Sequence, residues 1–257
     1  MNMKVLQTAE RVSHRDPSDN YVFQRSLLAY LEAAKLISGD VLEIGAGEGY
    51  GIEYLAPKAK TYHTLDKHLV KIDPKHTNVT FQQMNIPPLA GIEDNSFDYV
   101  VSFQVIEHIQ NDKKYVSEIH RVLRPGGKFI LTTPNRHMSI TRNPWHVREY
   151  TIDELDKLLR VNFSDVETNG VYGNQKIMDY FESNKASVRK ITRFDIFDLQ
   201  HKLPRWLLQI PYDILNRVNR KKLLNQENSV VAEIRHDDFF VKKAEEGCLD
   251  LFYIATK

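Results

Sequence analysis

The chain has 257 residues, 42% of them hydrophobic, which is enough for one α/β domain that carries a sizeable insertion. Its 35 Lys and Arg residues nearly balance its 34 Asp and Glu residues, whereas a general nucleic-acid binder shows a basic excess, so no specific nucleic-acid partner is expected. The single cysteine, Cys248, excludes an internal disulfide framework and is expected to be a small apolar residue at the start of a C-terminal strand. Because there is no signal sequence and no run of about 18 apolar residues, we expect a cytoplasmic protein.

Apolar residues at helical spacing predict a first helix over residues 20–36, which ends at Ser38-Gly39-Asp40. We assign residues 1–39 to an N-terminal helical cap. Beyond the cap, short apolar runs bounded by turn residues predict strands, with helical segments between them. The predicted strands are residues 41–44, 61–65, 79–82, 97–103, 128–133, 166–171 and 249–255. The predicted helices between them are residues 52–55, a segment ending at Leu123, and a helix that starts at the capping-box pair Thr151 and Glu154 and runs to about Leu159.

Alternating strands and helices favour a parallel sheet with helices on both faces. We therefore predict an α/β fold: a Rossmann-like, mostly parallel, seven-stranded sheet whose core occupies residues 40–173. Residues 174–232 look helical and are too long for an ordinary connection, so we predict a helical insertion before the last strand. Residues 233–257 would then supply the C-terminal strand that completes the sheet.

A cluster of glycines follows the first predicted strand, in Gly45-Ala46-Gly47-Glu48-Gly49. Glycine tolerates positive φ and lets the backbone approach a ligand closely, and open α/β sheets bind ligands at the carboxyl ends of their strands. The next strand ends in Asp66, about twenty residues further on, where a carboxylate can accept hydrogen bonds from both hydroxyls of a ribose. A dinucleotide fingerprint would need a glycine in place of Tyr50, so the pattern favours a different adenosine ligand.

Three segments resemble, in family order, the motifs of the class I S-adenosylmethionine-dependent methyltransferases. They are VLEIGAGEGYG, FDYVVSFQVIEHI and LRPGGKFILTTPN, and together they cover roughly Asp40 to Asn135. The resemblance implies an enzyme whose cofactor is S-adenosylmethionine. It places Glu43 and the glycine loop along the methionine part and Asp66 on the ribose, with the segment from Met84 to Ile86 around the adenine. The cofactor-binding residues implied in this way are Glu43, Gly45, Ala46, Gly47, Gly49, Asp66, Lys67, Met84, Asn85, Ile86, Phe103 and Gln104.

The start of the first helix is a further candidate for the cofactor site. In many relatives this region, here His14, Arg15, Tyr21 and Arg25, closes over the cofactor. A solvated helix face is the alternative interpretation of the same residues.

The catalytic candidates are Glu107 and His108, just after the fourth strand, and His146, on the loop after the fifth. They resemble a Glu-x-x-Glu-His segment and a later histidine that hold a divalent metal near the acceptor hydroxyl in the ubiquinone-biosynthesis O-methyltransferases, the closest group in motif, and in the small-RNA 2′-O-methyltransferases. Gln104 replaces the first Glu, and a neutral amide binds a hard cation less well than a carboxylate. Three interpretations are open: Glu107, His108 and His146 bind a metal; a histidine acts without metal as a general base or orients the acceptor; or the residues only brace their turns.

A basic segment lies in the predicted insertion, where residues 185–222 contain ten Lys and Arg residues against three Asp residues. Apolar residues from Trp206 to Val218 are interleaved at near-helical spacing. The segment could be a lid over the acceptor pocket, a peripheral contact with the inner face of a membrane, or a surface for a polyanionic acceptor. A packed helical pair with a basic solvated face is the fourth alternative. Pro204 and Pro211 are predicted to divide the segment into short helices.

Taken together, these patterns favour an S-adenosylmethionine-dependent methyltransferase that O-methylates a small-molecule or lipid-like acceptor by in-line displacement. An RNA 2′-O-methyltransferase is the second hypothesis, and the near-neutral charge counts against it. A nucleotide-dependent oxidoreductase would want a glycine at Tyr50. A non-catalytic protein that only binds the cofactor is the remaining class. The identity of the acceptor and the oligomeric state are not predicted.

Overall fold

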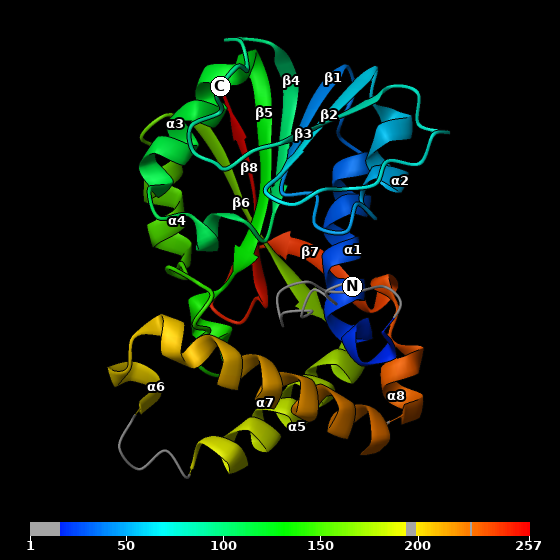
Figure 1. The fold of residues 1–257 in the computed structure, drawn as a ribbon, viewed down its shortest axis with the longest axis vertical. Coiled ribbons are helices and arrows are strands. Elements are labelled where there is room, and N and C mark those ends of the chain that lie inside the picture. Colours follow the sequence, from blue (N-terminus) through cyan, green and yellow to red (C-terminus); the bar gives the residue numbers. More distant parts are fainter. Residues whose placement is uncertain (1–15, 194–198, 227) are drawn as a thin grey trace, which may run out of the picture.

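An eight-stranded sheet forms the centre of the computed structural model, which describes residues 16–193, 199–226 and 228–257. The strands lie in the order β3-β2-β1-β4-β5-β8-β6-β7 (Figure 1). Their bounds are β1 Asp40–Ile44, β2 Thr61–Asp66, β3 Val79–Gln83, β4 Phe97–Phe103, β5 Leu123–Pro134, β6 Asp165–Gly173, β7 Phe239–Lys243 and β8 Asp250–Thr256. His14 and Arg15, with the rest of the first fifteen residues, lie outside the described residues, as do residues 194–198 of the predicted insertion.

The first five strands are parallel, and β8 runs antiparallel to both β5 and β6. This arrangement confirms the predicted Rossmann-like, mostly parallel sheet, but the predicted number of seven strands is wrong. The additional strand, β7, pairs with β6 in antiparallel fashion at one edge of the sheet. Its residues, FFVKK, are mostly exposed, so they show neither the apolar run of a buried strand nor a clear alternation.

Two layers of helices cover the sheet, because successive side chains of a strand point to opposite faces. On β1, Val41 packs in a core cluster with Leu28 of α1, whereas Leu42 packs in a second cluster with Ile119 of α3 and Leu155 of α4. The capping box of Thr151 and Glu154 is present at the start of α4. The helix bounds are α1 Asn20–Ala34, α2 Ile52–Leu55, α3 Asp112–Val122 and α4 Ile152–Leu159.

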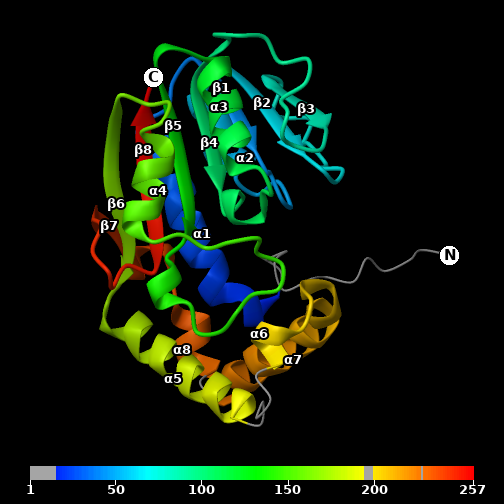
Figure 2. The ribbon, with the colours of Figure 1, turned by 90° about the vertical axis from the view of Figure 1, so that its left-hand side faces the viewer.

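Four further helices lie below the carboxyl ends of the central strands (Figures 1 and 2). They are α5 Gln175–Thr192, α6 Leu199–Lys202, α7 Arg205–Gln226 and α8 Asn228–Glu233. The expectation that Pro211 ends a helix is wrong: α7 continues through Pro211, which lies on its exposed side, so only Pro204 separates two helices. No helix among the described residues has both the length and the apolar character needed to cross a bilayer.

A buried carboxylate joins the N-terminal cap to α7. Asp19, in the 3₁₀ turn Pro17–Asp19, is fully buried and accepts hydrogen bonds from Arg217 at 2.8 Å and Arg220 at 2.7 Å. The side-chain amide of Asn20 donates two further hydrogen bonds. One goes to the carbonyl of Val231 in α8 and the other to the carbonyl of Ile234, just after that helix. Two of the positive charges in the predicted basic segment therefore point into the molecule and hold α7 in place.

Replacing Asp19 tests how much this contact stabilises the fold. We expect Asp19→Asn to lower the free energy of unfolding by about 3 kcal/mol, because removing one partner of a buried ion pair is strongly destabilising. Urea denaturation followed by circular dichroism measures the change. In the control Asp165→Asn, an exposed position at the start of β6, the change should stay within about 0.5 kcal/mol. Equal stabilities of the two variants would contradict a stabilising role for Asp19.

Candidate functional site

A cavity of about 710 Å³ lies at the carboxyl ends of β1, β4 and β5. The sheet side contributes the glycine loop, the end of β4 and the turn after it. α1 closes one side, and α5 and α7 close the opposite end. Representative lining residues are Tyr21, Arg25, Gly45, Gly47, Phe103, Glu107, His146, Phe181, Leu208 and Asp250.

The glycine loop has the backbone conformation that its sequence predicts. Gly45, Gly47 and Gly49 all have positive φ, at 89°, 59° and 83°. A Cβ on Gly45 would come within 2.4 Å of the Val105 side chain, whereas a Cβ on Gly47 would meet nothing within 4 Å. The loop therefore packs against the protein at Gly45 and leaves open space beside Gly47, where a ligand can approach the backbone.

Asp66 and the residues after β3 lie side by side, next to the glycine loop. The Asp66 carboxylate accepts a hydrogen bond from the Gly47 N–H at 2.9 Å, and its carbonyl accepts one from the Met84 N–H at 3.0 Å. Met84 and Ile86 are half-buried, whereas Lys67 and Asn85 are exposed. These predicted cofactor residues lie outside the cavity lining and form an adjoining, more open surface.

Glu43 lies near the end of β1, just before the glycine loop. Its carboxylate is buried beneath the loop, where it accepts hydrogen bonds from Tyr30 at 3.0 Å and Thr64 at 2.7 Å, and it does not line the cavity. Burial raises the pKa of the Glu43 carboxyl, and hydrogen bonds from neighbouring hydroxyls oppose that shift. Glu43 thus braces α1 and β2 under the cofactor surface.

At the end of β4, Phe103 and Gln104 both line the cavity. Gln104 has a positive φ of 56°, and its side-chain amide donates to the Thr132 hydroxyl at 3.3 Å. A positive φ is uncommon for a residue with a side chain, so the backbone turns sharply here. This turn leads directly into the segment that carries Glu107 and His108.

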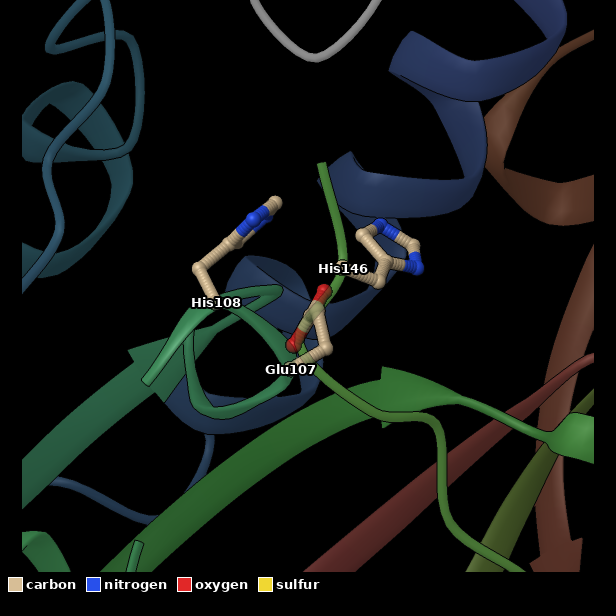
Figure 3. Close-up of side chains that lie close together, drawn as sticks. All are labelled: Glu107, His108 and His146. Atoms are coloured by element: carbon tan, nitrogen blue, oxygen red, sulfur yellow. The ribbon is translucent and has the colours of Figure 1, made fainter. Parts of the chain in front are cut away.

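His146 comes together with Glu107 and His108 although it belongs to a separate segment of the chain (Figure 3). One potential ligand atom from each lies within 4.8 Å of the others, and the two imidazole rings are 5.0 Å apart. Glu107 is buried and accepts a hydrogen bond from the Thr133 hydroxyl at 3.0 Å. Its carbonyl accepts the Val147 N–H at 2.7 Å, which fixes the loop of His146 against the turn.

Hydrogen bonds assign the protons of both rings. Nδ1 of His146 lies 2.6 Å from the Glu149 carboxylate, and Nε2 lies 2.9 Å from the Asn143 amide nitrogen. Because a carboxylate only accepts and an amide nitrogen only donates, Nδ1 carries the proton and Nε2 is an acceptor. The Trp145 carbonyl likewise places the proton of His108 on Nδ1, at 3.2 Å. The proton is thus placed on Nδ1 in both rings, and Nε2 of His146 is an acceptor.

Sequence reasoning missed Glu149 and Asn143, which orient His146. The only available signal was their spacing of three residues on either side of the histidine, within one loop.

Sequence reasoning missed Asp250, at the start of β8, as well. It forms an ion pair of 3.1 Å with Arg25 of α1, and both residues line the cavity. Burial raises the pKa of the Asp250 carboxyl, and the Arg25 charge opposes that shift.

The chemistry of the donor set suits a transition metal better than Mg²⁺. One carboxylate and two imidazoles are ligands typical of zinc-type sites, whereas Mg²⁺ prefers oxygen ligands. The hydrogen bond from His146 to the Glu149 carboxylate is the support that metal-binding histidines usually have. A metal on Nε2 would displace Asn143 from that nitrogen. The residues therefore fit a metal, and they fit a general base equally well.

Comparisons of the sequence with known proteins identify methyltransferases among its relatives. A family profile described as a methyltransferase domain matches residues 42–131. A Mycolicibacterium smegmatis protein described as a "probable S-adenosylmethionine-dependent methyltransferase" is 33% identical over 264 residues, covering 97% of this chain and 94% of the relative. A Mycobacterium tuberculosis protein with the same description is 35% identical over 191 residues, covering 70% of this chain and 69% of the relative. The ubiquinone biosynthesis O-methyltransferase of Xanthomonas oryzae is 30% identical over 117 residues, covering 42% and 49%.

Two methyltransferases are among the solved structures with a similar fold. Phosphoethanolamine N-methyltransferase 2 of Haemonchus contortus, in complex with phosphomonomethylethanolamine and S-adenosylhomocysteine, gives a TM-score of 0.54 at 19% identity, covering 98% of this chain and 59% of that chain. An S-adenosylmethionine-dependent methyltransferase from Thermotoga maritima gives a TM-score of 0.54 at 17% identity, covering 92% of each chain. At these levels of sequence identity, the similarity to the two solved structures is a similarity of fold.

The position of Asp66 generates a prediction for cofactor binding. We expect Asp66→Ala to weaken S-adenosylhomocysteine binding at least about 100-fold, because hydrogen bonds to a charged acceptor contribute about 1.5–3 kcal/mol each. Isothermal titration calorimetry measures the affinity. Asp73→Ala, at an exposed carboxylate that contacts only Lys75, is the control and should bind like the wild type. Unchanged binding in Asp66→Ala would remove this residue from the cofactor site.

Proposed function

This chain belongs to the S-adenosylmethionine-dependent methyltransferases, and from that premise we propose that it methylates a hydroxyl group of an apolar, lipid-like acceptor held in the cavity. The observation that carries the proposal is the position of His146, oriented by Glu149, in the same cavity as the glycine loop. S-adenosylmethionine is the cofactor, and its methyl group must reach this cavity from the loop side.

The proposed reaction is an in-line displacement at the methyl carbon. The acceptor oxygen attacks, the bond between methyl and sulfur breaks, and S-adenosylhomocysteine leaves as a neutral thioether. The acceptor hydroxyl replaces the Asn143 amide at Nε2 of His146 and passes its proton to that nitrogen, and the Glu149 carboxylate stabilises the resulting imidazolium. The cavity walls align the reactants, and alignment alone can contribute about 7–11 kcal/mol to lowering the barrier.

Oxygen is favoured over nitrogen because a hydroxyl must lose its proton as it attacks, and Nε2 of His146 in the cavity is an acceptor nitrogen. An apolar acceptor is favoured by the walls away from the sheet, where α5 and α7 contribute Phe181, Val188 and Leu208. The near-neutral charge of the chain counts against an RNA acceptor.

A metal ion is the second candidate for activating the hydroxyl, and the clustering of Glu107, His108 and His146 favours it. These three side chains would hold the ion, which would act as a Lewis acid toward the acceptor oxygen. In that case Glu149 and Thr133 would orient the ligands His146 and Glu107.

The general-base role of His146 predicts a selective loss of turnover. We expect His146→Gln to lower kcat about 10²–10⁴-fold and to leave S-adenosylhomocysteine affinity unchanged, because the ring removes a proton without holding the cofactor. The assay follows label from S-adenosylmethionine into fractions of a cell extract, and mass spectrometry locates the methyl group. His120→Gln, on α3, is the control and should keep full activity. Label found only on nitrogen or in RNA would contradict the proposal.

A chelator separates the two ways of activating the hydroxyl. If His146 acts as a base without metal, dialysis against EDTA should leave kcat unchanged and added Zn²⁺ or Mn²⁺ should not raise it. The same assay measures both effects. A loss of activity that returns with added metal would instead assign Glu107, His108 and His146 to a metal site.

A further inference from the structure

The outer face of α7 is apolar over four turns. It consists of two adjacent rows of side chains spaced four residues apart, which places them on one side of a helix. These residues are Trp206, Ile210, Ile214 and Val218 in one row and Leu207, Pro211 and Leu215 in the other. Their exposure is large: 68% for Trp206, 65% for Ile210 and 57% for Val218. The face is about 18 Å long at the rise of an α-helix.

This concentration of exposed apolar side chains is confined to one helix. Six of the eleven exposed large hydrophobic residues in the described part of the chain lie on α7, and the others are scattered over five elements or loops. Single exposed apolar residues need no explanation, whereas a contiguous patch marks an interaction surface. The opposite side of α7 is already used, since Asn219 bonds to Ser187 of α5 and Asp213 accepts from Trp145.

Positive charge lies at both ends of the outer face. The first row continues into Lys222, Lys221 is its neighbour in the chain, and both are exposed; Lys202 of α6 is exposed just before α7 begins. The single acidic residue of α7, Asp213, is buried. An apolar helix face with lysines beside it and no exposed acid matches the surface of a membrane that contains anionic lipids.

The outer face also meets the cavity. Pro211 and Leu215 belong to the face and line the cavity as well, and Leu199 of α6, which is 44% exposed, lines it from the neighbouring helix. Three apolar residues are therefore shared by the exposed surface of these helices and the cavity lining. The cofactor surface near Asp66 and Met84 lies on the other side of the cavity, outside its lining.

We infer that α7 lies in the surface of an anionic membrane and that the cavity takes its acceptor directly from the lipid layer. The docking step depends only on the outer face and its lysines. The second step, in which a membrane lipid with a hydroxyl group enters past Leu199, Pro211 and Leu215, rests on the proposed function.

Flotation of the full chain with vesicles tests the docking step. We expect binding to vesicles of phosphatidylcholine with phosphatidylglycerol, weaker binding to phosphatidylcholine alone, and release by salt. The intensity and wavelength of Trp206 fluorescence should change on binding, and brominated lipid should quench it. Both effects should be lost in Trp206→Phe, which retains only Trp145.

Two pairs of variants separate the apolar and the charged contributions. Ile210→Ser/Ile214→Ser should bind vesicles about tenfold more weakly or worse, whereas Leu36→Ser/Val161→Ser, at exposed apolar residues near the amino ends of β1 and β6, should bind normally. Lys221→Glu/Lys222→Glu should lose binding to a similar degree, and Lys58→Glu/Lys60→Glu, before β2, should not. Calorimetry with S-adenosylhomocysteine confirms that each variant is folded.

The outcomes distinguish the docking inference from the proposed function. If the wild type binds no vesicles, or if the variants bind as their controls do, docking is wrong even when a soluble hydroxyl compound is methylated. If light scattering shows that Ile210→Ser/Ile214→Ser turns a dimer into a monomer and no vesicle binding is found, the face belongs to a second copy and the inference is also overturned. If vesicles are bound but only water-soluble compounds are methylated, docking stands and entry of the acceptor from the lipid layer is wrong.

Discussion

The position of α7 depends on one buried negative charge. Asp19 holds Arg217 and Arg220 of α7 against the N-terminal cap, so that a helix remote from the sheet becomes a wall of the cavity. The same contact points these two arginines inward. The outward side of α7 is left to apolar side chains and to Lys221 and Lys222. One ion cluster thus sets both the inner wall of the site and the character of the outer surface.

The cofactor side of the site could be predicted from the sequence because its features are local. A glycine loop after a buried strand, and an acid at the end of the next strand, fix their own backbone conformation and their place on a parallel sheet. The structure accordingly brings Gly47 and Asp66 into direct contact. Glu43 shows the limit of the same reasoning, since the sequence gives its neighbourhood but not the direction of its side chain, which turns toward Tyr30 and Thr64.

The acceptor side could be predicted only in part, because its contacts join segments that are distant in the chain. Glu107, His108 and His146 were recognisable as residue types, but the partners that orient His146 became visible only with the loop in place. Pro211 was expected to end a helix, and tertiary contacts of α7 with the cap and α5 override that local preference. The edge strand β7 escaped prediction because its exposed residues carry no periodic signal.

The bonds from Asp19 to Arg217 and Arg220 join residues that are 198 and 201 positions apart. Contacts between such distant residues form late in folding, because the intervening chain must first be ordered. During synthesis, the glycine loop and Asp66 leave the ribosome well before α7 does, so a partly made chain can have a cofactor surface while its acceptor chamber is still open to water. A chain that still lacks α7 therefore lacks one wall of the cavity next to the glycine loop.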